Sequence, residues 1–151
     1  MTILYFAYGS NLLDREIRKD ALDAEAIGSA YLPGHRLVFT KHSTSRGCDA
    51  ANIEPYDSGI VWGCLYRVTE RDREALRRRE RGYREVKVGA RARTPEGGSD
   101  KTVEAFTFVG EETCPRMCGP NAAYLGLIIE GARSRGLPES YIEKIEGEGF
   151  S

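Results

Sequence analysis

The sequence of 151 residues has almost no net charge, few histidines and no long uncharged apolar run. Its 22 basic residues nearly balance 23 acidic ones, so the protein as a whole carries no field that attracts nucleic acid or anionic lipid. No apolar run reaches the roughly 20 residues that a membrane span needs. Residues 1–13 also lack the basic start of a signal peptide. We therefore expect a cytoplasmic protein without nucleic-acid or membrane partners.

Cysteine and histidine are too scarce, and too scattered, to suggest a metal centre. The four cysteines, in a chain without an export signal, are expected to be reduced thiols. Cys114 and Cys118 have the spacing CxxxC, but His35 and His42, which could complete a site with them, lie far upstream. Two ordinary thiols in a loop are the simpler interpretation, so no bound metal is predicted.

The composition is that of a folded domain. Hydrophobic residues make up 40% of the sequence and charged residues 30%, whereas a disordered tail has fewer apolar residues and unbalanced charge. This length suits one hydrophobic core, and no repeat or Pro/Ser-rich linker divides the chain. We therefore expect a single domain over residues 1–151, with frequent sharp bends because 17 residues are glycine.

Hydrophobic periodicity and turn residues predict the order of the elements. Strands are expected over residues 3–8, 26–32, 36–42, 59–68, 84–92 and 102–109, and helices over 14–21, over 69–81, after Pro120 and after Pro138. Pro33-Gly34 is expected to turn the chain between the second and third strands, and residues 43–50 to form a loop. Because strands and helices do not alternate regularly, a doubly wound parallel sheet is disfavoured. The order predicts an α+β fold in which helices flank a small mixed sheet or closed β-barrel.

The helix after Pro120 is expected to be amphipathic. Apolar or small residues recur at the helical spacing i, i+3, i+4, i+7 and i+8, namely Tyr124, Leu127, Ile128, Gly131 and Ala132. This face should pack against the barrel.

The segment Tyr8-Gly9-Ser10-Asn11-Leu12 lies where the first buried strand gives way to a helix. Glycine lets the backbone turn sharply and approach a ligand closely. The amides that follow have no intrahelical partner and can hold an oxyanion or a carboxylate. A plain strand-to-helix turn, capped by Ser10 or Asn11, is the alternative, and the sequence pattern alone does not separate the two.

Glu80 is the one glutamate of the predicted helix 69–81 that borders the core. Thr69 and Asp72 form a capping box at the start of this helix. On a helical wheel Glu80 lies only about 40° from the core residue Leu76. A carboxylate at such a boundary is partly desolvated, which suits it to proton transfer. The alternative is a structural glutamate paired with an arginine.

The same helix carries six arginines between Arg71 and Arg81, which raises the possibility of RNA contact. Four acidic residues in and next to this stretch offset them: Glu70, Asp72, Glu74 and Glu80. A solvated face with i,i+4 ion pairs is therefore the favoured interpretation.

Five segments carry a resemblance to a known family. They are YFAYGSNL at residues 5–12, ANIEP at 51–55, VWGCLYRV at 61–68, LRRRERGYREVKV at 76–88 and PNAAYLGLIIEGARSRGLPESYIEKI at 120–145. Together they resemble the gamma-glutamylcyclotransferase family, also described as AIG2-like or BtrG-like, and they run nearly from end to end of the chain.

The resemblance implies a small mixed β-barrel flanked by helices and an enzyme without a cofactor. The reaction it implies converts a small γ-glutamyl amide into 5-oxoproline and a free amine. Glu80 stands where the family has its catalytic acid/base, and Tyr124 where a tyrosine closes the pocket. The glutamyl group would be held, chiefly by backbone amides, by Tyr8, Gly9, Ser10, Asn11, Leu12 and Leu13. A non-catalytic module that binds a glutamate-like metabolite is the alternative function, and a homodimer is compatible with the sequence.

Overall fold

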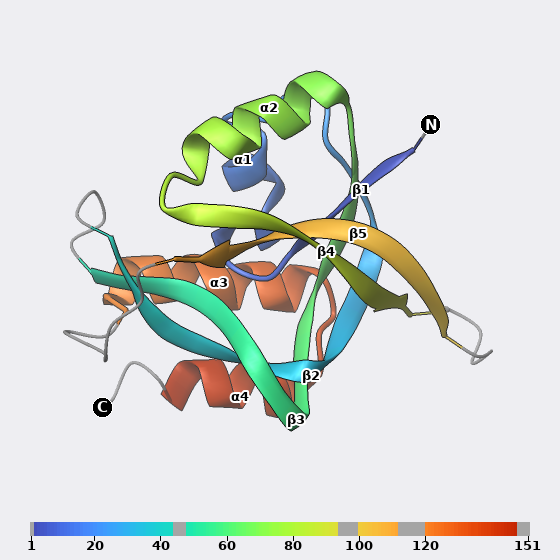
Figure 1. Cartoon of the computed structure of the whole chain (residues 1–151). Coiled ribbons are helices and arrows are strands. Elements are labelled where there is room, and N and C mark those ends of the chain that lie inside the picture. Colours follow the sequence, from blue (N-terminus) through green and yellow to red (C-terminus); the bar gives the residue numbers. More distant parts are fainter. Residues whose placement is uncertain (1, 44–47, 94–99, 112–119, 148–151) are drawn as a thin grey trace.

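The computed structural model describes residues 2–43, 48–93, 100–111 and 120–147. Within them, the strands close into a barrel in the order β1-β3-β2-β4-β5. The strands are β1 (Ile3–Ala7), β2 (Glu25–Ser43), β3 (Cys48–Val68), β4 (Tyr83–Ala92) and β5 (Lys101–Gly110). The helices are the short 3-10 helix η1 (Ser10–Leu12), α1 (Asp14–Ile17), α2 (Glu70–Arg79), α3 (Ala122–Ser134) and α4 (Glu139–Gly147). Figure 1 shows α1 and α2 on one side of the barrel and α3 and α4 on the other. The predicted α+β barrel flanked by helices is confirmed.

The first strand lies between two others in the barrel, and its last three residues are buried. β1 pairs with β3 in antiparallel register, Ile3 opposite Val68, and contacts β5 in parallel orientation through Tyr5 and Phe106. The Thr107 hydroxyl, fully buried, donates a 2.7 Å hydrogen bond to the Phe6 carbonyl. Tyr5, Phe6, Ala7 and Tyr8 are all buried. Because successive side chains of a strand point to opposite faces, both faces are covered here, which explains the apolar run at residues 3–8.

The prediction of a turn at Pro33-Gly34 is wrong, because β2 continues through it. Pro33 pairs with Ile60, and the next paired residue, His35, lies opposite Pro55. Residues 56–59 of β3 are therefore inserted between two paired stretches as a large bulge. Gly34 takes a φ of +75°, so the residues that indicate a turn serve here to kink a strand.

The predicted loop over residues 43–50 is only partly within the described chain. Residues 44–47 lie outside it, and residues 48–50 already belong to β3, with Ala50 opposite Lys41 of β2.

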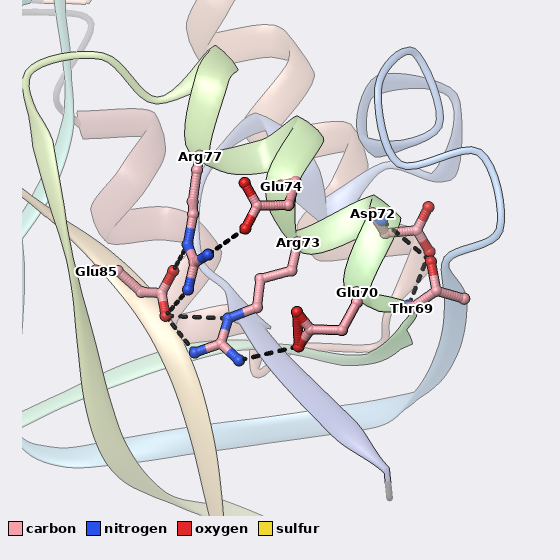
Figure 2. Close-up of polar contacts among 7 residues, drawn as sticks. All are labelled: Thr69, Glu70, Asp72, Arg73, Glu74, Arg77 and Glu85. Atoms are coloured by element: carbon pink, nitrogen blue, oxygen red, sulfur yellow. Dashed lines mark hydrogen bonds and ion pairs between the residues drawn. The ribbon is translucent and has the colours of Figure 1, made fainter.

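Helix α2 begins as predicted and is fixed to the barrel by ion pairs. The Thr69 hydroxyl accepts a 3.0 Å hydrogen bond from the Asp72 amide, and the Asp72 carboxylate accepts one of 3.0 Å from the Thr69 amide. Farther along, the guanidinium groups of Arg73 and Arg77 converge on Glu85 of β4, with Nε–Oε distances of 3.1 and 2.6 Å (Figure 2). These contacts hold the end of α2 at the start of β4.

Helices α3 and α4 complete the fold. The predicted buried face of α3 is confirmed except that Leu125, rather than Leu127, is fully buried. Gly131 allows α3 to approach η1, since a Cβ placed there would lie 2.5 Å from the Leu12 Cβ. The chain then turns at Gly136, whose φ is +66°, and α4 packs on α3.

Candidate active site

One end of the barrel is opened by the divergence of β2 and β4. These strands pair only at Ala30–Ala92 and Tyr31–Arg91, and then separate toward the end of β2 and the start of β4. The separated ends are tied by hydrogen bonds. The Tyr83 hydroxyl donates to the Ala51 carbonyl (2.9 Å), the Gly110 amide to Asn52 Oδ1 (2.8 Å) and Lys41 Nζ to the Glu111 carbonyl (2.6 Å). The mouths of β-barrels are among the preferred places for ligand sites.

The predicted loop at residues 8–13 borders this opening. A Cβ built on Gly9 would lie 3.6 Å from the Ala51 Cβ and 3.7 Å from the Tyr124 hydroxyl. The structure therefore brings Gly9 and Tyr124, predicted from separate motifs, together with Ala51. We call the place where Tyr8, Gly9, Ala51, Tyr83 and Tyr124 meet the barrel mouth.

Hydrogen bonds from Arg135 and Tyr66 fix the loop at residues 8–13. The Leu12 carbonyl accepts hydrogen bonds from Arg135 Nε (3.0 Å) and the Tyr66 hydroxyl (3.1 Å), and Arg135 also forms a 2.6 Å ion pair with Asp14. Leu12 is fully buried and Leu13 nearly so. The conformation of the loop is thus fixed before any ligand arrives, as preorganised binding requires.

The loop amides divide into two groups. Those of Leu12 and Leu13 donate to the carbonyls of Gly9 (3.0 Å) and Ser10 (3.1 Å), so both are used to close the turn. The amides of Gly9 and Asn11, in contrast, donate to no acceptor among the described residues. Of the six loop residues predicted to bind substrate, Leu12 and Leu13 therefore have amides that already donate within the turn.

Asn11 is buried beside Tyr5, a residue that the sequence did not single out. Asn11 Nδ2 donates a 3.1 Å hydrogen bond to the Tyr5 hydroxyl, while Asn11 Oδ1 is buried with no partner among the described residues. Tyr5 stands in the apolar run of β1, and an aromatic residue in such a run indicates only a buried strand. The polar loop that follows β1 was the only feature of the sequence that could have indicated a functional role for the Tyr5 hydroxyl.

Glu80 is the C-cap residue of α2 and is partly buried. Its amide donates to the Leu76 carbonyl (2.9 Å) and its carbonyl accepts from the Tyr83 amide (3.1 Å), so the residue forms the link between α2 and β4. Burial is the main reason why the pKa of Tyr5 lies above its ordinary value, and the negative charge of Glu80 is the next. Burial, Tyr83 and then Glu80 likewise raise the pKa of Tyr8. The Glu80 carboxylate is therefore within electrostatic reach of both hydroxyls.

Tyr8 and Tyr124 both lie at the mouth, and both are buried. The Tyr8 hydroxyl donates a 2.6 Å hydrogen bond to the Phe108 carbonyl, and the Tyr124 hydroxyl accepts one of 2.9 Å from the Ala51 amide. The Asn121 side chain caps α3 by accepting from the Tyr124 amide (2.8 Å), which fixes the start of that helix. Tyr83, like Tyr5, was not predicted as a site residue, although it follows Glu80 closely in sequence.

Three of the six arginines between Arg71 and Arg81 lie in ion pairs, namely Arg73, Arg77 and Arg79. Arg73 and Arg77 bind Glu85, Arg77 also contacts Glu74, and Arg79 pairs with Asp20 at 3.1 Å. Such pairing is what the alternative of a solvated, neutralised face predicts.

The cysteines lie only partly within the described chain. Cys114 and Cys118 fall outside the described residues, as does the side chain of Cys48. Cys64 is buried in β3, and burial raises the pKa of its thiol to about 11. Within the described part of the chain, no cluster of His, Cys, Asp and Glu could hold a metal ion. In the same part, no helix is long and apolar enough to cross a membrane.

Comparisons with known proteins show which family this chain is similar to. The model of the AIG2-like family matches residues 60–145. Gamma-glutamylcyclotransferase of Mus musculus is 30% identical over 96% of this chain and 78% of the mouse protein. The Homo sapiens protein of the same name is 28% identical over the same shares. A solved gamma-glutamyl cyclotransferase superimposes with a TM-score of 0.87, at 26% identity, over 97% of this chain and 87% of the other.

The fold and these matches define an enzyme of the gamma-glutamylcyclotransferase type. The chain belongs to the AIG2-like, or gamma-glutamylcyclotransferase, family.

Proposed function

We propose that this protein cyclises a γ-glutamyl amide, releasing 5-oxoproline and a free amine or amino acid, with Glu80 as general acid and base. The observation that carries the proposal is the position of the Glu80 carboxylate, within electrostatic reach of Tyr5 and Tyr8 at the loop that precedes η1. Support also comes from relatives named gamma-glutamylcyclotransferase, which align over most of the chain.

The chemistry needs one group that moves a proton twice. The substrate's α-ammonium gives a proton to Glu80, and the resulting amine attacks the γ-carbonyl carbon, so that a ring C–N bond forms. Glu80 then protonates the leaving nitrogen as the original amide C–N bond breaks. The ring nitrogen still carries one proton too many, which it gives to the regenerated Glu80 carboxylate, so that the lactam is neutral. Glu80 passes this second proton to the released amine, which leaves as an ammonium ion. A positioned carboxylate contributes typically 10²–10⁴-fold to such a step. No step requires a cofactor.

The barrel mouth would contribute mainly by holding the glutamyl chain folded. The nucleophile and the carbonyl belong to one molecule, and well-oriented intramolecular reactions reach effective molarities of about 10⁵–10⁸ M. The buried rings of Tyr8 and Tyr124, each fixed by a hydrogen bond to backbone, form rigid walls for this purpose.

The Gly9 and Asn11 amides are the proposed oxyanion donors. They are the loop amides without an acceptor among the described residues, and they belong to a turn that Arg135 and Tyr66 hold in place. A preorganised donor of this kind is worth roughly 10²–10³-fold in turnover.

The test is release of 5-oxoproline from a panel of γ-glutamyl amides that differ in the leaving amine. Glu80→Gln should reduce kcat by at least about 100-fold while the protein keeps its fold. Glu74→Gln is the matched control, since Glu74 lies on the same helix and pairs with Arg77 at the surface. An E80Q protein that turns over as fast as the wild type would refute the assignment of Glu80.

The alternative function, a binding module for a glutamate-like metabolite, gives a different result in the same panel. No γ-glutamyl amide would be converted, whereas glutamate-like ligands would still raise the melting temperature.

A further inference from the structure

A second cleft, separate from the barrel mouth, lies between the β2–β3 pair and α4. It has a volume of about 690 Å³ and shares no lining residue with the loop at 8–13, Glu80, Tyr83 or Tyr124. Clefts of roughly 300–1,000 Å³ are the usual size of small-molecule sites. We call it the α4 cleft. Figure 1 shows β2, β3 and α4, which border it, on the side of the barrel away from α2.

The inserted residues of β3 build one wall of the α4 cleft. The bulge at 56–59 places Tyr56 and Ser58 along it, and the Arg36 guanidinium lies 4.6 Å from the centre of the Tyr56 ring. Arg36 also pairs with Glu54 at 2.9 Å. A Cβ on Gly59 would lie 2.3 Å from the His35 carbonyl oxygen, so the bulge is pressed tightly onto β2. This wall is therefore a fixed feature of the fold.

Aromatic and aliphatic side chains form the rest of the cleft. Trp62 is half-buried, with Tyr31 packed on it at 4.9 Å between ring centres and the Arg93 guanidinium 4.7 Å from its ring. From α4, Tyr141 and Ile145 are buried against the cleft. Because its neighbours fix the indole of Trp62, it offers a preformed surface for an apolar group.

The charged side chains that line the cleft are positive. Arg36 is balanced by Glu54, whereas Lys144 of α4 is exposed and forms no ion pair among the described residues. Within the described chain no Asp or Glu lines the cleft. Three residues with hydroxyl groups line it, namely Ser58, Ser140 and Tyr141. An apolar surface with one uncompensated cation and several hydroxyl donors is complementary to an anion with an apolar body.

We propose that the α4 cleft binds a small organic carboxylate that carries an aromatic or branched apolar group. The apolar group packs in the part of the cleft lined by Trp62 and Ile145, and the carboxylate lies at Lys144. This site is independent of the proposed catalytic function, because the two share no residue.

The cleft contains its own reporter, since Trp62 is the only tryptophan in the sequence. Binding can be followed by its fluorescence and, in parallel, by calorimetry, with 3-phenylpropionate as the probe and the uncharged 3-phenylpropionamide as its control. We expect saturable binding of the carboxylate with a Kd of about 1 mM or lower, and binding of the amide at least about 10-fold weaker.

Three variants test whether the carboxylate binds in the α4 cleft itself. Lys144→Gln should remove the preference for the carboxylate, and Lys87→Gln, on the exposed face of β4, should leave it unchanged. Glu80→Gln should also leave binding unchanged, so failure of this proposal and failure of the catalytic one are distinguishable. The proposal is overturned if neither method detects saturable binding, if acid and amide bind equally, or if K144Q keeps the preference. It is also overturned if E80Q abolishes binding of 3-phenylpropionate. The same holds if the change in Trp62 fluorescence follows self-association of the protein and not binding of the carboxylate.

Discussion

The Tyr124 hydroxyl accepts a 2.9 Å hydrogen bond from the Ala51 amide, which joins the first turn of α3 to the barrel wall beside Gly9. Two segments separated by 73 positions are thereby fixed on the same side of the mouth. The Tyr124 hydroxyl is thus one of the contacts that fix the shape of the candidate site.

Tyr124→Phe should lower both stability and activity. The change leaves the Ala51 amide buried without an acceptor, which costs about 1–3 kcal/mol of unfolding free energy. Urea denaturation and 5-oxoproline release measure the two effects. Tyr31→Phe is the control, because its hydroxyl donates to Asp100 at the surface (2.8 Å) and should matter little. Equal stability of Y124F and the wild type would contradict the anchoring role.

Gly131→Ala should be destabilising, although alanine is the better helix former. The added Cβ would lie 2.5 Å from the Leu12 Cβ and would push α3 away from η1. We expect a loss of about 1–3 kcal/mol, together with lower activity because the loop shifts. Gly126→Ala, on the same helix with no atom within 4 Å of the new Cβ, should instead stabilise by about 0.5–1 kcal/mol. If both variants have the same stability, the close packing of α3 on η1 is not the reason why position 131 needs glycine.

The ion pairs of Glu85 should make stability depend on acid pH. Hydrogen bonds from Arg77, then from Arg73, hold the pKa of Glu85 below its ordinary value of 4.5 in the folded protein. This contribution to stability is complete above pH 4.5 and is lost as the pH falls through the lower, folded-state pKa. Glu85→Gln should therefore lose less stability than the wild type between pH 5 and acid conditions, as thermal unfolding at a series of pH values would show. Parallel pH profiles of the two proteins would contradict this.

Cys64 should be unreactive in the native protein. Its buried thiol has a pKa of about 11, so at pH 8 on the order of 0.1% is thiolate. Alkylation with iodoacetamide, followed by peptide mass spectrometry, should modify Cys64 in urea but not in buffer. Rapid native labelling of this residue would show that β3 opens readily.

Local patterns in the sequence predict the parts of this structure that depend on neighbours in the chain. Thr69 and Asp72 form the predicted capping box, which follows from helical geometry alone. The helix predicted to run to residue 81 ends at Arg79, and Glu80 is its C-cap with non-helical backbone angles, so its angle on a helical wheel does not apply. The strand predicted over residues 84–92 matches β4 closely.

Features that depend on distant partners were not predictable. Pro33-Gly34 has the composition of a turn, but pairing of β2 with β3 on both sides of it outweighs the local preference. Tyr5 and Tyr83 contribute hydroxyls to the site only because the barrel brings β1, α2 and β4 together. The amides of Leu12 and Leu13 donate hydrogen bonds that close the turn. No pattern in the sequence distinguishes such amides from amides that face a ligand.

The surplus segment 56–59 interrupts β3 while Ile60 still faces Pro33 on one side and Pro55 faces His35 on the other. Its length can therefore vary without disturbing strand registration. Shortening or grafting this stretch would remodel the outer rim of the molecule while leaving the geometry around Glu80 untouched. Changes in this segment could therefore alter ligand binding in the α4 cleft without changing the proposed reaction at Glu80.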